Sequence, residues 1–299
     1  MSDITIRSMK TAHDAALFQE LQRRVWGKND EVEIIPASVI VTIKKSGGVF
    51  VGAFSEEGPP ELKGLVGSGL GWLGARTDDD GTFLGLKLSS HIVGVLPEWQ
   101  GKGVGYRVKL GQREEVLAQG LTDWMTWTFD PLYLPNGILN INRLGATCTT
   151  YGRNIYGYMN DDLNAGAPTD RCQVDWRLKS KRVMTAISPD RPKRSLLYSV
   201  DPKMITMLPV KTSSTNLQQP VEAALSQHLN GAPIAMPIPD DIAAIRRTDN
   251  QLGLAWRMYV REVIESAFAA GYAVMDCQQL ENNGRPTWHY ILAQEELPK

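Results

Sequence analysis

The sequence of 299 residues predicts an α/β protein with a mixed sheet, followed by a smaller α+β domain. Two segments with apolar residues, 49–55 and 62–74, flank a turn with glycine and proline, which indicates adjacent antiparallel strands. Residues 86–129 then read strand, glycine loop, helix and strand, which indicates a parallel pair with a right-handed crossover. The composition changes after residue 178, where a charged stretch with prolines begins.

Composition and charge limit the classes of function. With 32 basic and 33 acidic residues the formal net charge is -1, which gives no argument for nucleic acid or an acidic membrane as a partner. The cysteines lie far apart without C-x-x-C spacing, which argues against a disulfide framework and a zinc site: Cys148, Cys172 and Cys277. The N-terminus shows no signal-peptide pattern, and no run of about 18 apolar residues occurs. We therefore expect a soluble, cytoplasmic protein without a metal ion.

The first elements follow from β-branched alternation and from a helix cap. Residues 4–9 predict an opening strand. Thr11 predicts a helix N-cap, because Asp14 follows three residues later and apolar side chains then recur at helical spacing. Residues 36–48 are ambiguous: their β-branched run favours a strand, whereas the proline before it and the Gly-Gly pair after it favour a helix. We expect a helix there.

The middle of the chain carries the parallel unit. Residues 86–97 predict a strand in which Gly94 marks a bulge or a close approach of another backbone. Residues 104–119 carry a broad apolar face and Gly120 follows them, which predicts a helix. The aromatic and β-branched segment 121–129 predicts the next strand.

The C-terminal part has an apolar pattern of its own, so we divide the chain into domains 1–181 and 182–299. Apolar residues at helical spacing predict a long helix that Gly271 closes, and two strands are expected after it. The residues of that helix face are Leu252, Trp256, Tyr259, Val263 and Ala267.

Three glycines at alternate positions, Gly101, Gly103 and Gly105, stand between a predicted strand and a predicted helix. A phosphate there would meet successive backbone N–H groups and the positive end of the helix dipole. The plain alternative is a glycine-rich turn. A Walker loop is excluded because no G-K-[ST] occurs, and a dinucleotide fold fits poorly because its G-x-G-x-x-G belongs on the first strand of the chain.

The stretch "VGVLPEWQGKGVG" resembles the acyl-coenzyme A signature of the GNAT superfamily of N-acetyltransferases, [QR]-x-x-G-x-[GA]. The elements around it have the family's order, including "NGILNINRLGA" (136–146), which looks like its Asn-started helix. Other segments look like a poorly characterised subgroup of longer GNAT proteins. The resemblance implies a mixed, mostly antiparallel sheet flanked by helices and split by a wedge between two parallel strands. It leaves residues 182–299 as a degenerate GNAT-like lobe or as a lid or dimerisation element.

The resemblance also implies a set of cofactor-binding residues. The loop amides would hold the pyrophosphate of coenzyme A, the strand would pair with the pantetheine arm, and its N–H would face the thioester oxygen. A bulge at Gly94 would open the slot for the thioester. The implied residues are Val93, Val95, Gln100, Gly101, Lys102, Gly103, Val104, Gly105 and Asn136.

Direct attack of an amine on a thioester needs a proton acceptor and, in some relatives, an acid for the thiolate. His91 is one candidate base, expected on the same strand face as Val93, and Asp130 after the next strand is another. The plain alternatives are a core histidine and a turn-opening aspartate. Many relatives place a tyrosine acid where this chain has Ile141, so Tyr151 or Tyr156 from the next segment is the expected acid, with a core or rim tyrosine as the alternative.

The acceptor site is expected around Trp127 and Arg171. Tryptophans at strand alternation could line an apolar pocket, although core packing is the plain alternative. Arg171 is a forked donor suited to a carboxylate, unless it pairs with a neighbouring aspartate. Arg257 and Arg261 stand four residues apart on a predicted helix, where a surface salt-bridge row is expected.

Together these expectations describe an N-acetyltransferase that moves acetyl from acetyl-CoA to a primary amine of a small metabolite. A succinyl-CoA donor or an amino-acid acceptor is a variant. The alternative from another class is a non-catalytic acyl-CoA-binding module that regulates or binds a partner protein. Neither nucleic acid nor membrane is expected as a partner, and a homodimer stays open.

Overall fold

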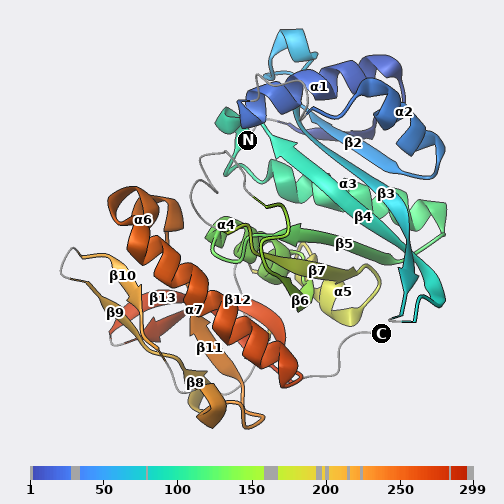
Figure 1. Ribbon diagram of the computed structural model, residues 1–299. Helices are drawn as coiled ribbons and strands as arrows, with labels where there is room; N and C mark the ends of the chain where they lie inside the picture. The colour runs from blue at the N-terminus through green and yellow to red at the C-terminus, as the bar shows by residue number, and fades with distance from the viewer. Residues whose placement is uncertain are drawn as a thin grey trace. The chain divides into compact units, whose positions relative to one another are not determined.

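The computed structural model describes residues 3–27, 34–78, 80–157, 168–192, 197–198, 202–213, 216–222, 225–282 and 284–294. The chain divides into two compact units, Met1–Trp127 and Thr128–Lys299 (Figure 1). This division does not coincide with the expected boundary at 181/182. The physical reason is strand pairing, because Cys148 lies opposite Val274 in neighbouring strands on either side of that boundary.

The first unit is built on a sheet in the order β1-β2-β3-β4-β5. Strands β1 to β4 pair antiparallel, and β5 runs parallel to β4, so the sheet is mixed and mostly antiparallel, as the sequence predicts. The strands are β1 (Thr5–Ser8), β2 (Val49–Phe54), β3 (Leu65–Thr77), β4 (Phe83–Val95) and β5 (Trp124–Phe129).

Helices cover both faces of this sheet. A Cβ on Gly94 would meet Leu21 and Trp26 of the first helix, whereas Cβ atoms on Gly67 and Gly69, which lie on the other face, would meet the third. The helices are α1 (Ala12–Trp26), α2 (Ala37–Lys45) and α3 (Val104–Gln119), with short 3₁₀ turns η2 (Pro60–Leu62) and η3 (Pro97–Trp99). The ambiguous segment 36–48 is therefore helical, as expected.

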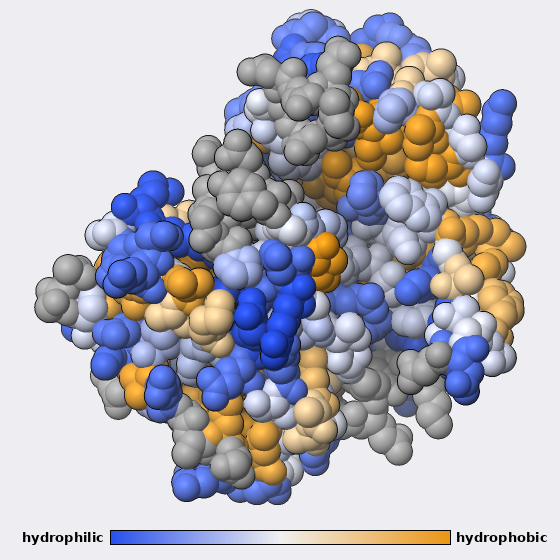
Figure 2. All heavy atoms as spheres, in the orientation of Figure 1, coloured by the Kyte–Doolittle hydropathy of each residue, from blue (hydrophilic) through white to orange (hydrophobic). Residues whose placement is uncertain are grey.

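The surface of the first unit carries apolar side chains over α2 and the β3–β4 hairpin (Figure 2). Val39, Phe83 and Leu84 are exposed there. Nothing in the described part of the chain shows what would cover them, so the homodimer stays a prediction.

The strands of the second unit follow one another in the order β7-β6-β12-β13-β11-β8, and β9 forms a separate hairpin with β10. Its strands are β6 (Thr147–Gly152), β7 (Arg171–Arg177), β8 (Thr206–Met207), β9 (Val210–Thr212), β10 (Gln218–Pro220), β11 (Ile234–Pro237), β12 (Ala273–Asn282) and β13 (Arg285–Ala293). Its helices are α4 (Leu134–Gly137), a π-helical turn (Ile138–Arg143), α5 (Lys181–Ala186), α6 (Ile242–Thr248) and α7 (Asn250–Ala269), with 3₁₀ turns η5 (Pro202–Met204) and η6 (Leu225–Gln227).

The predicted long helix of the C-terminal part is α7. All five residues predicted for its apolar face are buried, and Gly271 follows it with φ of 80°. The charged stretch from 179 contains a helix, α5, which Ser180 caps by accepting the N–H of Val183. Lys181 and Arg182 of this stretch therefore lie in a helix.

The N-terminus of α1 generates a stability prediction. Asp14 accepts the N–H groups of Lys10 and Thr11 and pairs with Arg7 at 2.9 Å, while Thr11 accepts the N–H of Asp14. Burial by itself would raise the pKa of Asp14, but these hydrogen bonds outweigh it and lower that pKa.

We expect Asp14→Asn to lower the free energy of unfolding at pH 7 by about 1–2 kcal/mol. Because the folded-state pKa is lowered, this contribution is present above about pH 4 and is lost as the pH falls through the folded value. Denaturant titration at pH 7 and at pH 3 measures it, with Asp3→Asn as the control. An equal loss at both pH values would contradict the assignment.

Candidate functional site

The glycine loop lies between β4 and α3 and takes its shape from two left-handed residues. Gly101 has φ of 72° and Gly103, the N-cap of α3, has φ of 81°. A side chain would strain the backbone at both positions. Gly101 and Lys102 are exposed, and no atom lies within 4 Å of a Cβ built at either glycine. The loop is therefore open to solvent at the start of a 16-residue helix.

The backbone N–H groups of this loop are not engaged by the backbone carbonyls that the structure describes. Among the described residues, no backbone carbonyl accepts an N–H from any of residues 101–105, and the first helix-closing bond of this region runs from Arg107 N to Gly103 O. Gly105 is already helical, and its Cβ would only touch Val95 at 3.8 Å. Neither backbone strain nor packing within the described chain requires a glycine there. The loop thus offers N–H groups and free space to an anion.

The charged residues around the loop also favour an anion there. The first turn of α3 contains no acidic residue, and Arg107 stands near that positive helix end. Lys102 Nζ lies 4.9 Å from the ring centroid of Trp99. Cations at a helix N-terminus are unfavourable unless an anion joins them. Sequence reasoning missed Arg107, although its place in the first predicted turn was a usable signal.

The strand before the loop has one free edge. Leu96 donates its N–H to Val66 O of β3, so by alternation the backbone groups of Val93 and Val95 point away from β3. The pairing of β4 with β5 consists of Leu88 with Met125 and Ser89 with Thr126. No further pair joins the two strands in the part of the chain described. They therefore part after Ser89, and we call this place the fork.

The sequence predicts a bulge at Gly94, but the bulge near the fork is at His91. Ile92 lies opposite Leu70 and Ser90 lies opposite Gly71, which leaves His91 as the extra residue of β4. Gly94 keeps regular register opposite Ser68. The glycine serves packing instead, because a Cβ there would approach Trp26 to 2.7 Å.

The bulge also turns His91 away from the face expected for it. Its ring lies against Trp72, with centroids 4.7 Å apart, and Trp72 is on the face opposite to Gly71 and Ser90. His91 and the side chain of Val93 therefore occupy different faces. The surrounding protein lowers the pKa of His91, although part of its ring is exposed, so the imidazole is neutral at pH 7.

Gln100 has a role within the loop. Its Nε2 donates to Val95 O at 3.2 Å, so the side chain closes the carbonyl of the free edge and leaves the Val95 N–H open. Val104, the first residue of α3, is buried against the sheet and contributes only its N–H to the open side.

A buried lysine lies at the fork, and sequence reasoning missed it. Lys109 Nζ donates to Ser90 Oγ at 2.7 Å and lies 3.5 Å from the ring centroid of Trp127. Ser90 Oγ donates in turn to Gln112 Oε1 at 2.9 Å. Burial lowers the pKa of Lys109 well below its usual value. The signal in the sequence was the position of Lys109, which stands between apolar residues of the predicted helix face. Trp127 thus contacts this cation, although it was predicted to line the acceptor pocket.

Asp130 is engaged in an ion pair within the second unit. Its Oδ2 lies 2.5 Å from Nη2 of Arg257 and 4.0 Å from Nη1 of Arg171, and its Oδ1 accepts the N–H of Leu132. Arg257 is 0% exposed. Burial disfavours its charge, but the Asp130 carboxylate raises the pKa of Arg257 above the usual value. The Asp130 carboxylate is therefore already occupied by a buried guanidinium and a backbone N–H, which argues against Asp130 as the base.

The predicted surface row on α7 is therefore a buried network. Arg261 forms two hydrogen bonds with Asp170, at 2.8 and 2.9 Å, and Tyr151 donates to the same carboxylate at 2.8 Å. Burial and the Asp170 carboxylate raise the pKa of Tyr151 well above its usual value. A phenol that holds its proton so firmly is a weak acid, which disfavours Tyr151 as the proton donor.

Tyr156 and Arg171 lie together at the end of β5. Tyr156 is 52% exposed, its hydroxyl forms a 2.7 Å hydrogen bond with Thr128 Oγ1, and the Arg171 guanidinium lies 5.4 Å from its ring centroid. Arg171 Nη1 also donates to Asp170 O. Asn136 is half-buried in α4, and Ile141 is buried at the position where relatives carry a tyrosine.

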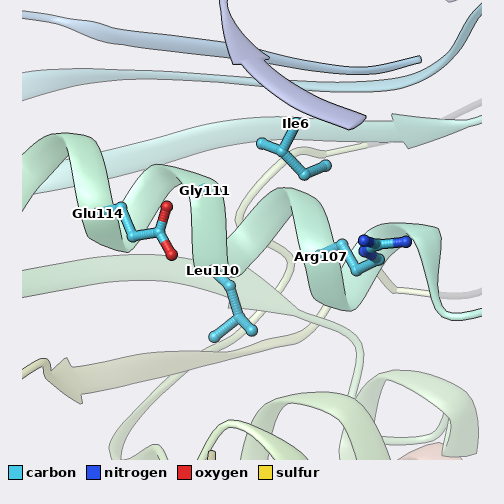
Figure 3. Close-up of a pocket in the computed structure, with 5 residues that line it drawn as sticks. All are labelled: Ile6, Arg107, Leu110, Gly111 and Glu114. Carbon is cyan, nitrogen blue, oxygen red and sulfur yellow. The ribbon is translucent and has the colours of Figure 1, made fainter. Parts of the chain in front are cut away.

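Two cavities lie elsewhere. The one in Figure 3 is about 230 Å³ and is lined by Ile6 of β1 and by the middle of α3. The second unit has one of about 360 Å³ between the turn 132–135 and residues 240–243. Neither is lined by a residue of the glycine loop. In the described part of the chain, no cluster of three or more His, Cys, Asp and Glu could hold a metal ion. No described helix has the length and apolar character needed to cross a bilayer.

Solved structures similar to part of the chain are acetyltransferases. Arabidopsis thaliana NAA60 in complex with acetyl-CoA matches with a TM-score of 0.46 and 13% identity, over 60% of this chain and 100% of that chain. A putative acetyltransferase from Salmonella typhimurium with its cofactor acetyl-CoA matches with 0.44 and 18%, over 59% and 95%. A putative acetyltransferase of the GNAT family from Desulfovibrio desulfuricans matches with 0.42 and 16%, over 59% and 99%.

No family model matches the chain, and no curated relative matches it.

The Asp130–Arg257 pair generates a second prediction. We expect Asp130→Asn to lower the free energy of unfolding by about 3 kcal/mol, because it leaves a fully buried guanidinium without its counter-ion. Replacing Arg257 by Met in that background should restore part of the loss, since the unpaired charge is then gone. Denaturant titration measures both, with Asp123→Asn on the surface as control. A change within about 0.5 kcal/mol for Asp130→Asn would mean that the pair is not structural.

Proposed function

We propose that this chain is an acyl-CoA-dependent N-acyltransferase, which moves an acyl group, acetyl in the simplest case, to a primary amine of a small metabolite. The observation that carries this proposal is the glycine loop. Its amides at residues 101–105 are unused by described carbonyls and face free space at a helix N-terminus, next to the free edge of β4. A diphosphate with an amide-bearing arm is complementary to this pair of features.

In this proposal the loop binds the pyrophosphate through main-chain N–H groups, with Lys102 and Arg107 as cations at its rim. Val93 and Val95 present their outward backbone groups to the pantetheine arm, as an added strand would require. The N–H of Val93 is suited to donate a hydrogen bond to the thioester oxygen as negative charge develops there, a contribution of roughly 3 kcal/mol in other acyl transfers. Asn136 would steady the arm or the sulfur. Coenzyme A, when bound, supplies the activated thioester.

The proton acceptor in this proposal is His91. It stands at the bulge beside the fork, is partly exposed and is neutral at pH 7, whereas Asp130 is held by Arg257. An attacking amine would pass its proton to the imidazole as the C–N bond forms. Tyr156 is the better of the two tyrosine candidates for the acid, because its hydroxyl is not committed to a carboxylate.

The acceptor is proposed to be a small amine that carries a carboxylate. Arg171 supports this choice, because its guanidinium lies 5.4 Å from the ring centroid of the exposed Tyr156. A planar guanidinium binds a carboxylate through two parallel hydrogen bonds.

A non-catalytic acyl-CoA-binding module is the second candidate. The buried Ile141 at the tyrosine position and the engagement of Asp130 favour it. Incubation with acetyl-CoA or succinyl-CoA and a panel of primary amines separates the two, with release of free thiol as the readout. Turnover indicates the enzyme, and saturable binding without turnover indicates the module.

Gly105 provides the sharpest test of the loop. We expect Gly105→Leu to raise the free energy of unfolding by about 0.5 kcal/mol, since leucine favours a helix and the site has room. The same side chain covers the loop amides, so affinity for coenzyme A in calorimetry should fall about tenfold or more. Ala118→Leu, at an exposed position of the same helix, is the matched control. Unchanged affinity in Gly105→Leu would overturn the assignment of the loop.

His91 provides a pH test. Since its pKa is lowered, a base of this kind gives a kcat/KM that rises with pH through a midpoint below 6.5 and is level above it. We expect His91→Gln to bind coenzyme A normally, to lose about 100-fold in kcat and to lack this limb. A wild-type limb that persists in the variant would assign the base elsewhere.

A further inference from the structure

Lys109 occupies a place in the first unit that its charge does not explain. It is 4% exposed and stands on α3 under the fork, between Ser90 of β4 and Trp127 of β5. These two residues directly follow the last pair that joins the strands, Ser89 with Thr126. The amine therefore bridges β4 and β5 at the closed end of the gap between their edges.

The surroundings of Nζ are rich in donors and poor in acceptors. An ammonium has three N–H donors, and one of them is given to Ser90 Oγ. The proton of that hydroxyl is already given to Gln112 Oε1, and Gln112 Nε2 has no partner among the described residues. In the part of the chain described, no carboxylate is paired with Lys109. What the cluster lacks is an acceptor with negative charge.

A structural role alone does not account for the amine. A buried stem of this length packs equally well as methionine, whereas an amine out of water costs several kcal/mol unless it is neutral or paired. The face of Trp127 offers a partial substitute for a counter-ion. A bound carboxylate would supply the missing acceptor.

We propose that the acyl group carried by the donor thioester ends in a carboxylate, and that Lys109 Nζ binds this carboxylate at the closed end of the fork. The inference rests on the proposed function, because it needs the pantetheine arm along the free edge of β4. An arm that starts at the loop passes Val95 and then Val93, so the acyl chain beyond the sulfur points toward Ser90. The donor class is thus a dicarboxylic acyl-CoA of the succinyl type, rather than acetyl-CoA.

Calorimetry on the full chain tests the inference with four probes: coenzyme A, acetyl-CoA, butyryl-CoA and succinyl-CoA. Butyryl and succinyl groups both have four carbons, so their difference isolates the carboxylate. We expect the wild-type protein to bind succinyl-CoA about 10- to 100-fold more tightly than butyryl-CoA. Equal affinity, or preference for butyryl-CoA, would overturn the inference without any variant.

Lys109→Met should abolish that preference, and its melting temperature should not fall, because an apolar side chain replaces a buried amine of similar length. Lys87→Met is the matched control: Lys87 also lies on a tryptophan of β5, Trp124, at 5.7 Å, but before the fork. It should keep the preference. A preference that survives in Lys109→Met would overturn the assignment, and so would mass-spectrometric detection of an acyl group on Lys109 itself.

The outcomes separate this inference from the proposed function. Failure of all four probes to bind removes the coenzyme A site and both proposals with it. Equal binding of all four keeps the loop assignment and removes only the role of Lys109.

Discussion

The constraint on which the candidate site in the first unit depends is the extra residue His91 in β4. His91 lies between two residue pairs of β3 and β4, Leu70 with Ile92 and Gly71 with Ser90. Strand β4 therefore keeps its antiparallel pairing with β3 on both sides of the bulge. Its parallel pairing with β5 ends within one residue of that point. Among the residues that the structure describes, no strand pairs with the backbone groups of Val93 and Val95 that point away from β3. Such an edge is costly to leave bare, and a ligand with amide groups is a natural complement to it.

The same strand leads into the glycine loop, so the free edge and the free amides form one continuous line of main-chain donors and acceptors. Binding of this type asks little of side chains. It requires space, which the glycines leave, and a helix end, which α3 provides. Three of the side chains near it act on the protein itself: Gln100 closes the Val95 carbonyl, Val104 packs on the sheet, and Trp99 lies under the Lys102 amine.

Buried charge is handled in two ways. In the second unit Asp130 with Arg257, and Asp170 with Arg261, form pairs whose attraction offsets the loss of water. In the first unit the contacts of the Lys109 amine with described residues are a hydroxyl and an aromatic face. In the first arrangement each carboxylate has a guanidinium as its counter-ion. In the second arrangement no carboxylate among the described residues pairs with Lys109, and for this reason we relate Lys109 to the acyl group of the donor thioester.

The sequence by itself determined the local elements of this protein: the cap at Thr11, the helix 104–119, the glycine loop and the order of strands around it. These depend on neighbours a few residues apart, and propensity and periodicity report such neighbours. Only the tertiary structure decided which distant side chains meet. Asp130 and its partner Arg257 are 127 residues apart in the sequence. Lys109 of α3 contacts Ser90 of β4. The bulge is at His91 because the pairing with β3 sets the register of β4, and the glycine at 94 does not. Such contacts depend on how whole elements pack, and a single chain's local pattern does not contain that information.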